Sequence, residues 1–220
     1  MKHPKSSPIL LLAAAFIVTA MVGFSVFIGN TGNKALAYIL TSLVYWCVFC
    51  LPLSFYFLGG YGAVRNVYAK PVSQTPAKAR RVLNLLAFMP CLGTLFAVFI
   101  PNIAALPIQA LGLALLYAVL NGAIEELFWR GVFIKIFPED ILKGYLLPTI
   151  FFGLWHIALY TLKGMRYQDG FAALVGGATL MGALWGWVAY RTKSIRTVTA
   201  AHIVANFFAF SGMIYENWFL

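Results

Sequence analysis

The chain has 220 residues, of which 62% are hydrophobic and 10% are charged, and its mean hydropathy is +0.85. A soluble domain carries about 25% charged residues, and a membrane β-barrel alternates apolar and polar residues in short segments. The composition excludes both classes and predicts an all-α, polytopic transmembrane helix bundle. The net charge of +10 does not indicate nucleic-acid binding, because most Lys and Arg stand in short segments between apolar runs.

Seven apolar segments follow one another along the chain, each near the length of about 20 residues that a membrane-spanning helix needs. They cover residues 8–29, 35–58, 82–101, 107–134, 144–162, 171–190 and 197–216. We therefore expect about seven spans, within a range of six to eight. The first segment is long for a cleaved signal peptide, so we expect it to remain as the first helix.

The basic residues are distributed unevenly between the loops when the loops are assigned alternately to the two sides. One side holds Lys2, Lys5, Arg65, Lys70, Lys78, Arg80, Arg81, Lys135, Lys143, Arg191, Lys193 and Arg196. The other side holds Lys34, Lys163 and Arg166. Because cytoplasmic loops are rich in Lys and Arg, we expect the N-terminus in the cytoplasm and the C-terminus outside.

A polar loop from Gly59 to Arg81 divides the chain into two parts. Residues 1–81 form N-terminal transmembrane helices and a basic cytoplasmic loop, which we expect to lie on the anionic inner membrane surface. Residues 82–220 form a second transmembrane bundle, and this bundle carries all the unusual intramembrane polar residues.

Two adjacent glutamates and an arginine occupy the fourth apolar segment, although the chain has only six acidic residues. Each charge costs about 2.5–3.5 kcal/mol near the bilayer centre, so such residues mark functional sites. Glu126 and Arg130 are four residues apart on one helix face and are expected to pair. Glu125 points about 100° away and has no local cation, which makes it the candidate general base.

Two histidines stand in later apolar segments at a similar depth, in the cytoplasmic half of the bilayer or near its midplane. His156 follows Phe152 by one helical turn, and His202 precedes Asn206 by one turn. His156 is positioned to share a proton with Glu125, and Asn206 to donate to a developing oxyanion. We expect one polar cavity, open to the cytosol, to collect these residues.

A structural role is the competing interpretation of each residue alone. An intramembrane His often bonds a neighbouring helix, and a Glu–Arg pair is often a clasp. Trp129, Trp155, Trp185 and Trp187 are interpreted as packing or interface aromatics. The combination of two Glu, two His and one Asn at matching depth favours a reactive site.

The three motifs Glu125-Glu126…Arg130, Phe152…His156 and His202…Asn206 resemble, in this order, the CAAX protease and bacteriocin-processing family, also called Abi. The resemblance covers residues 111–210. It implies an intramembrane endopeptidase of a bacterial cell membrane, acting on hydrophobic, C-terminally lipidated or bacteriocin-like peptides. It also implies that Glu125 and His156 activate water and that His202 and Asn206 stabilise the oxyanion. Glu126, Arg130 and Phe152 would support the site.

Metal dependence is open at this stage. Glu125, His156 and His202 are ligand types that a divalent metal such as zinc accepts, with a fourth position left for water. The chain lacks the His-Glu-x-x-His pattern of zinc proteases, and a metal-free mechanism is favoured.

Two further functions compete with proteolysis. A non-proteolytic immunity or scaffold protein of the same fold would tolerate replacement of Glu125. A proton-coupled transporter would use Glu125 as a proton site, but the chain is short and shows no internal repeat of the kind found in transporters.

Overall fold

The computed structural model describes residues 6–69 and 75–220, and this part of the chain is built from helices and the turns that join them. Seven helical stretches within it are long and apolar enough to cross a membrane. This finding confirms the predicted bundle of about seven spans and identifies an integral membrane protein. Helices suit hydrocarbon because every backbone N–H and C=O must find its hydrogen bond within the protein.

Several spans contain a π-helical turn, so one span often comprises two to four consecutive segments. The first three spans are α1 (Ser6–Gly29); α2 (Lys34–Val44), η1 (Tyr45–Cys50) and α3 (Leu51–Leu58); and α5 (Ala77–Leu86), α6 (Met89–Thr94), η2 (Leu95–Phe99) and α7 (Ile100–Asn102). The other four are α8 (Ile108–Glu126), η3 (Leu127–Val132) and α9 (Phe133–Ile136); η4 (Leu142–Leu146) and α10 (Leu147–Tyr160); η5 (Ala172–Gly176) and α11 (Gly177–Thr192); and α12 (Arg196–Ile214) and η6 (Tyr215–Phe219). The short helix α4 (Tyr61–Val67) separates the second span from the third.

The ends of the spans agree with the predicted segments to within five residues. The largest difference is at the third span, which begins at Ala77 instead of residue 82. Its helix continues through Lys78, Arg80 and Arg81, because a helix that leaves the hydrocarbon needs no apolar side chains. The apolar run therefore marks the membrane depth and not the whole helix.

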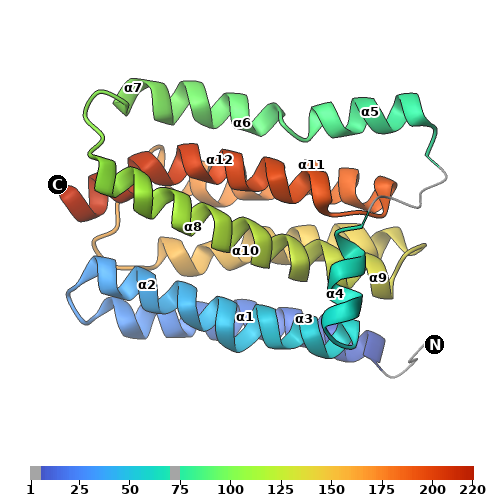
Figure 1. The fold of residues 1–220 in the computed structure, drawn as a ribbon. Helices are drawn as coiled ribbons and strands as arrows, with labels where there is room; N and C mark the ends of the chain where they lie inside the picture. Colours follow the sequence, from blue (N-terminus) through green and yellow to red (C-terminus); the bar gives the residue numbers. More distant parts are fainter. Residues whose placement is uncertain (1–5, 70–74) are drawn as a thin grey trace.

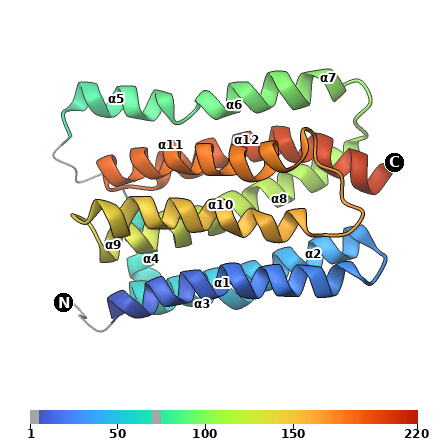
Figure 2. The same cartoon turned by 180° about the vertical axis from the view of Figure 1, so that it is seen from behind.

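The spans pack in layers around a central group of helices (Figures 1 and 2). The central group consists of α8, α10, α11 and α12, with α1, α2 and α3 on one side of it and α5, α6 and α7 on the other. The closest association is between α8 and α12, and α1 packs along α10. The helices that were predicted to carry the polar residues thus form the interior of the bundle.

The third span is the least buried. Only 11% of the residues in its most apolar stretch lie buried inside the protein, against 28–50% in the other spans. Its helix is interrupted between α5 and α6, where the N–H of Cys91 bonds to the carbonyl of Phe88 at 3.0 Å instead of that of Ala87. Ala87 O accepts a hydrogen bond from Trp185 Nε1 at 2.9 Å. The interruption thus anchors this span to α11.

The start of α1 and the C-terminus lie at opposite ends of the bundle, as an odd number of spans requires (Figure 1). Helix α4, the start of α5, α9 and the turn between α11 and α12 all lie at the end where α1 starts. These elements carry most of the described basic residues that were predicted to be cytoplasmic. Lys2, Lys5 and Lys70, assigned to the same side, lie outside the described residues.

We expect the α1-start end to face the cytoplasm, and cysteine labelling tests this orientation. In a variant without Cys47, Cys50 and Cys91, a membrane-impermeant maleimide added to intact cells should label Thr31→Cys. It should label Lys78→Cys only after permeabilisation. Both side chains are exposed, so the two variants are matched for accessibility. Labelling of Lys78→Cys in intact cells would show that the topology is the reverse of the one expected.

The contact between α8 and α12 depends on Gly122. A Cβ atom at this position would lie 2.8 Å from Ile203 Cγ1 and 3.0 Å from Ile203 N, so α12 would have to move away. The same helix contains Gly112, where a Cβ atom would meet nothing within 4 Å.

Gly122→Ala should destabilise the protein by about 1–3 kcal/mol, because overpacking forces the backbones apart. Gly112→Ala should be neutral or slightly stabilising, because Ala favours helix over Gly by up to about 1 kcal/mol. Thermal unfolding of the two purified variants in the same detergent is the measurement. Equal melting temperatures would show that the two helices do not pack as closely as described.

Candidate active site

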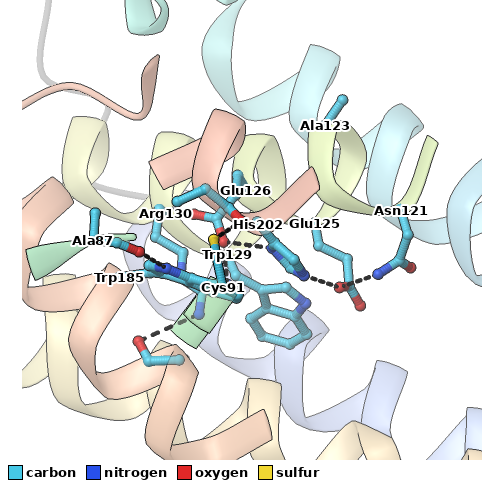
Figure 3. Close-up of polar contacts among 12 residues, drawn as sticks. Ala87, Cys91, Asn121, Ala123, Glu125, Glu126, Trp129, Arg130, Trp185 and His202 are labelled. Carbon is cyan, nitrogen blue, oxygen red and sulfur yellow. Dashed lines mark hydrogen bonds and ion pairs between the residues drawn. The ribbon is translucent and has the colours of Figure 1, made fainter. Parts of the chain in front are cut away.

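The charged residues of the first motif and His202 of the third meet at the contact between α8 and α12, in the interior of the bundle (Figure 3). Glu125 and Glu126 have no exposed surface, and His202 and Arg130 are 2% exposed. These four ionisable groups therefore form one cluster that is shielded from solvent. Ionised groups at such depth are stable only when they neutralise one another and their hydrogen-bonding atoms have partners.

Glu126 is the acceptor at the centre of the cluster. Its Oε1 lies 3.2 Å from Arg130 Nη1 and 2.9 Å from His202 Nδ1. The pairing of Glu126 with Arg130 that the four-residue spacing predicts is present. Arg130 also donates from Nη2 to the carbonyl of Gly182 at 3.3 Å, and its guanidinium lies 4.1 Å from the centre of the Phe152 ring.

The imidazole of His202 lies between the two carboxylates. Its Nδ1 faces Glu126, and its Nε2 is 3.6 Å from Glu125 Oε2. On one face the ring stacks on Trp185, with 4.3 Å between centroids and 26° between planes. Because Trp185 also bonds to Ala87 O, the third span contributes indirectly to the placement of His202.

Glu125 is held by hydrogen-bond donors on both oxygens. Trp155 Nε1 donates to Oε1 at 2.8 Å, and Asn121 Nδ2 donates to Oε2 at 2.7 Å. Asn121 in turn accepts a hydrogen bond from Trp46 Nε1 at 3.1 Å. The carboxylate is therefore oriented by residues from the second, fourth and fifth spans.

The expected contact between His156 and Glu125 is not among the hydrogen bonds of the described residues. His156 Nδ1 lies 2.8 Å from Phe152 O on its own helix, and the neighbouring Trp155 contacts Glu125 instead. A carbonyl oxygen can only accept, so Nδ1 carries the hydrogen and Nε2 of a neutral His156 is an acceptor. His156 is half-buried beside the Phe152 ring, with 5.0 Å between centroids.

Asn206 lies one turn after His202 on α12, as its spacing predicts. The side chain is 8% exposed, and its Nδ2 is buried without a hydrogen-bond partner among the described residues. An unsatisfied buried amide costs free energy, and each such group calls for an explanation. The N–H groups of Asn206 Nδ2 are therefore available to donate a hydrogen bond to a bound acceptor.

Helix α4 is joined to the site through the residue that follows it. The hydroxyl of Tyr68 donates to Ala123 O at 3.0 Å, two residues before Glu125. Burial and the nearby charge of Glu126 raise the pKa of Tyr68 to about 12. The hydroxyl therefore stays protonated at neutral pH and remains a donor to α8.

The cluster offers a position for a mobile proton. Arg130 carries one positive charge and the two carboxylates carry two negative charges, so neutrality requires one further proton. The hydrogen bond to Glu126 accounts for the hydrogen on Nδ1 of His202, which leaves the further proton between His202 Nε2 and Glu125 Oε2. This proton can pass between His202 and Glu125 without changing the net charge of the cluster in the apolar core.

A metal ion does not fit the observed arrangement. The residues that the structure describes contain no group of three His, Cys, Asp or Glu side chains placed to hold one. Among the predicted ligands, both ring nitrogens of His202 face carboxylates, and His156 Nδ1 bonds to a carbonyl. We therefore derive no step through a metal.

Sequence reasoning missed the aromatic residues that hold the charged groups. The interpretation of Trp129, Trp155 and Trp185 as packing aromatics is incomplete, because each indole N–H makes a buried hydrogen bond. The sequence places Trp155 next to His156 and Asn121 one helical turn before Glu125, so their positions were a signal that could have identified them. Trp46 is far away in the chain and carries no local signal of its role.

Fold and cluster define a polytopic α-helical membrane protein with a buried acid–base centre. Residues 107–208 match the family model described as Type II CAAX prenyl endopeptidase Rce1-like. This segment includes all three motifs, so the match confirms the resemblance seen in the sequence. No curated protein and no solved structure matches the chain.

Arg130→Ala should destabilise the folded protein by about 3–5 kcal/mol, because it leaves a buried carboxylate without its cation. Thermal unfolding in detergent would measure the loss, and the exposed Arg166→Ala serves as the control. The double variant Glu126→Gln/Arg130→Ala should recover part of the stability, since the uncompensated charge is gone. A fully stable Arg130→Ala variant would show that the pair contributes nothing to folding.

Proposed function

We propose that the protein is an intramembrane endopeptidase of a bacterial cell membrane, with a site that opens toward the cytoplasm. Its substrate is a hydrophobic or C-terminally lipidated peptide. The family match over residues 107–208 supports peptidase activity in general. The observation that carries the proposal is the buried Glu125–His202–Glu126 arrangement, with the unpartnered amide of Asn206 one turn away.

Glu125 acts as the general base. It is the carboxylate that makes no ion pair with Arg130, and its oxygens are oriented by Trp155 and Asn121. Glu126, in contrast, is committed to Arg130 and His202 and supports the site. A base must be oriented and free to accept a proton, and only Glu125 meets both conditions.

Hydrolysis proceeds by attack of a water oxygen on the carbonyl carbon of the scissile bond. Glu125 accepts a proton from this water, and His156, through its free Nε2, orients the water. The tetrahedral oxyanion that forms receives hydrogen bonds from Asn206 Nδ2 and from His202. When the carbon–nitrogen bond breaks, Glu125 returns the proton to the leaving nitrogen, so the products are a carboxylic acid and an amine.

Among the described residues the two carboxylates are closed off from solvent, so a substrate needs an opening to reach them. Cavities of about 680 Å³ and about 300 Å³ are lined by other residues, while Glu125 and Glu126 are completely buried. The third span is the least buried one and covers the side of the cluster where Trp185 stacks on His202. We infer that this span moves aside when the peptide enters from the bilayer.

The closed cluster also favours a second function, that of a non-proteolytic immunity or scaffold protein. A charge cluster without access to solvent can serve as a clasp between α8 and α12. Under this function the four charges hold the helices together and no peptide bond is cut. The two functions differ in what replacement of Glu125 does.

Glu125→Gln should bind substrate and cut it at least about 100-fold more slowly, which is the lower range of general base catalysis. The measurement is cleavage of a prenylated peptide, and of the same peptide without the prenyl group, by the purified full-length protein. Wild-type cleavage should also fall at acid pH, because protonated Glu125 cannot accept a proton.

Glu139→Gln is the matched control, because the side chain of Glu139 is 88% exposed and lies outside the cluster. It should cleave at the wild-type rate. Substantial cleavage by folded Glu125→Gln would remove this residue as the base. Absence of cleavage by the wild-type protein on both peptides, with the cluster intact, would favour the scaffold function.

A further inference from the structure

The second span reaches Glu125 through two consecutive hydrogen bonds. Trp46, which is 3% exposed and lies on the π-helical turn η1, donates from Nε1 to Asn121 Oδ1 at 3.1 Å. Asn121 Nδ2 then donates to Glu125 Oε2 at 2.7 Å. π-Helical turns interrupt α-helices frequently at functional sites, and this one lies against the candidate base.

The first of these bonds determines which side of the amide faces Glu125. The oxygen and nitrogen of an Asn amide occupy nearly equivalent positions, and a half-turn exchanges them. After such a turn the Asn121 oxygen would face a carboxylate oxygen, and two acceptors would repel each other. Because an indole N–H can only donate, Trp46 is satisfied only when the oxygen of Asn121 points toward it.

We propose that Trp46 is a positioning residue that acts through Asn121 to hold Glu125 in the orientation a general base needs. Trp155, whose indole N–H can also only donate, holds the opposite oxygen of Glu125. Together the two indoles fix the carboxylate from two other spans. The catalytic assignment of Glu125 rests on the proposed function, whereas the orientation of its carboxylate by Trp46 does not.

The chain provides a matched control in Trp218. Trp46 and Trp218 both contact the Tyr117 ring, at 5.5 and 5.6 Å between centroids. Trp218 Nε1 is buried without a hydrogen-bond partner among the described residues. Replacement of either residue by Phe removes one indole N–H from the same aromatic cluster, but only Trp46→Phe removes a hydrogen bond that leads to Glu125.

In the full-length protein, Trp46→Phe should lower kcat about tenfold, the effect of about one oriented hydrogen bond. KM should stay unchanged because Trp46 does not contact the substrate, and Trp218→Phe should leave both constants unchanged. In an Asn121→Ala background Trp46→Phe should cause no further loss. An equal loss of kcat in both backgrounds, or none in either, would overturn the role of Trp46.

A readout that does not need cleavage separates this inference from the proposed function. Infrared difference spectra against Glu125→Gln identify the carboxyl band of protonated Glu125. This band should persist to higher pH in Trp46→Phe than in the wild type, because the carboxylate has lost an oriented donor, and Trp218→Phe should match the wild type. A shifted band in a protein that cuts no peptide would refute the proteolytic function and keep the role of Trp46. An unshifted band would refute that role.

Discussion

Four ionisable groups buried between α8 and α12 are the constraint on which the rest of the structure depends. Removal of two carboxylates, a guanidinium and an imidazole from water costs several kcal/mol for each charged group. That cost is offset only if the groups meet at hydrogen-bonding distance, as Glu126 does with Arg130 and His202. The close approach of α8 and α12 at Gly122 is what brings carboxylates and imidazole within reach of one another.

The surrounding spans supply hydrogen-bond donors to the buried carboxylates. The interior contains few charges, so donors for the carboxylates come from indole and amide groups, and Trp155, Asn121 and Trp46 provide them. Gly182 on α11 leaves the space that the Arg130 side chain occupies. A Cβ atom at Gly182 would lie 2.7 Å from the Phe152 ring and 3.0 Å from Arg130 Nη2. The position of Arg130 therefore depends on a missing side chain in α11.

Chemistry and stability make opposing demands on this site. The cluster is neutral and closed when one proton is shared by Glu125 and His202, which favours a folded bundle. The proposed peptide hydrolysis needs Glu125 to be free of that proton, so that it can accept one from water, and it needs a substrate to enter. The unpartnered Asn206 amide is the one place in the motif residues of α12 where a hydrogen bond is left unmade in the described structure, and this is where the proposed hydrolysis would place a negative oxygen.

The sequence by itself determined the seven spans, because segment length and apolar composition are local properties that the bilayer selects. It also determined the pairing of Glu126 with Arg130, since helical spacing alone brings them together. Helical spacing likewise placed Asn121 beside Glu125, one turn away on the same helix. Only the tertiary structure decided that His202 lies between the two glutamates, that Trp155 takes the place expected of His156, and that Trp46 reaches Asn121. Those contacts join helices far apart in the chain, and their partners depend on how the helices rotate and approach each other, which no spacing within one helix specifies.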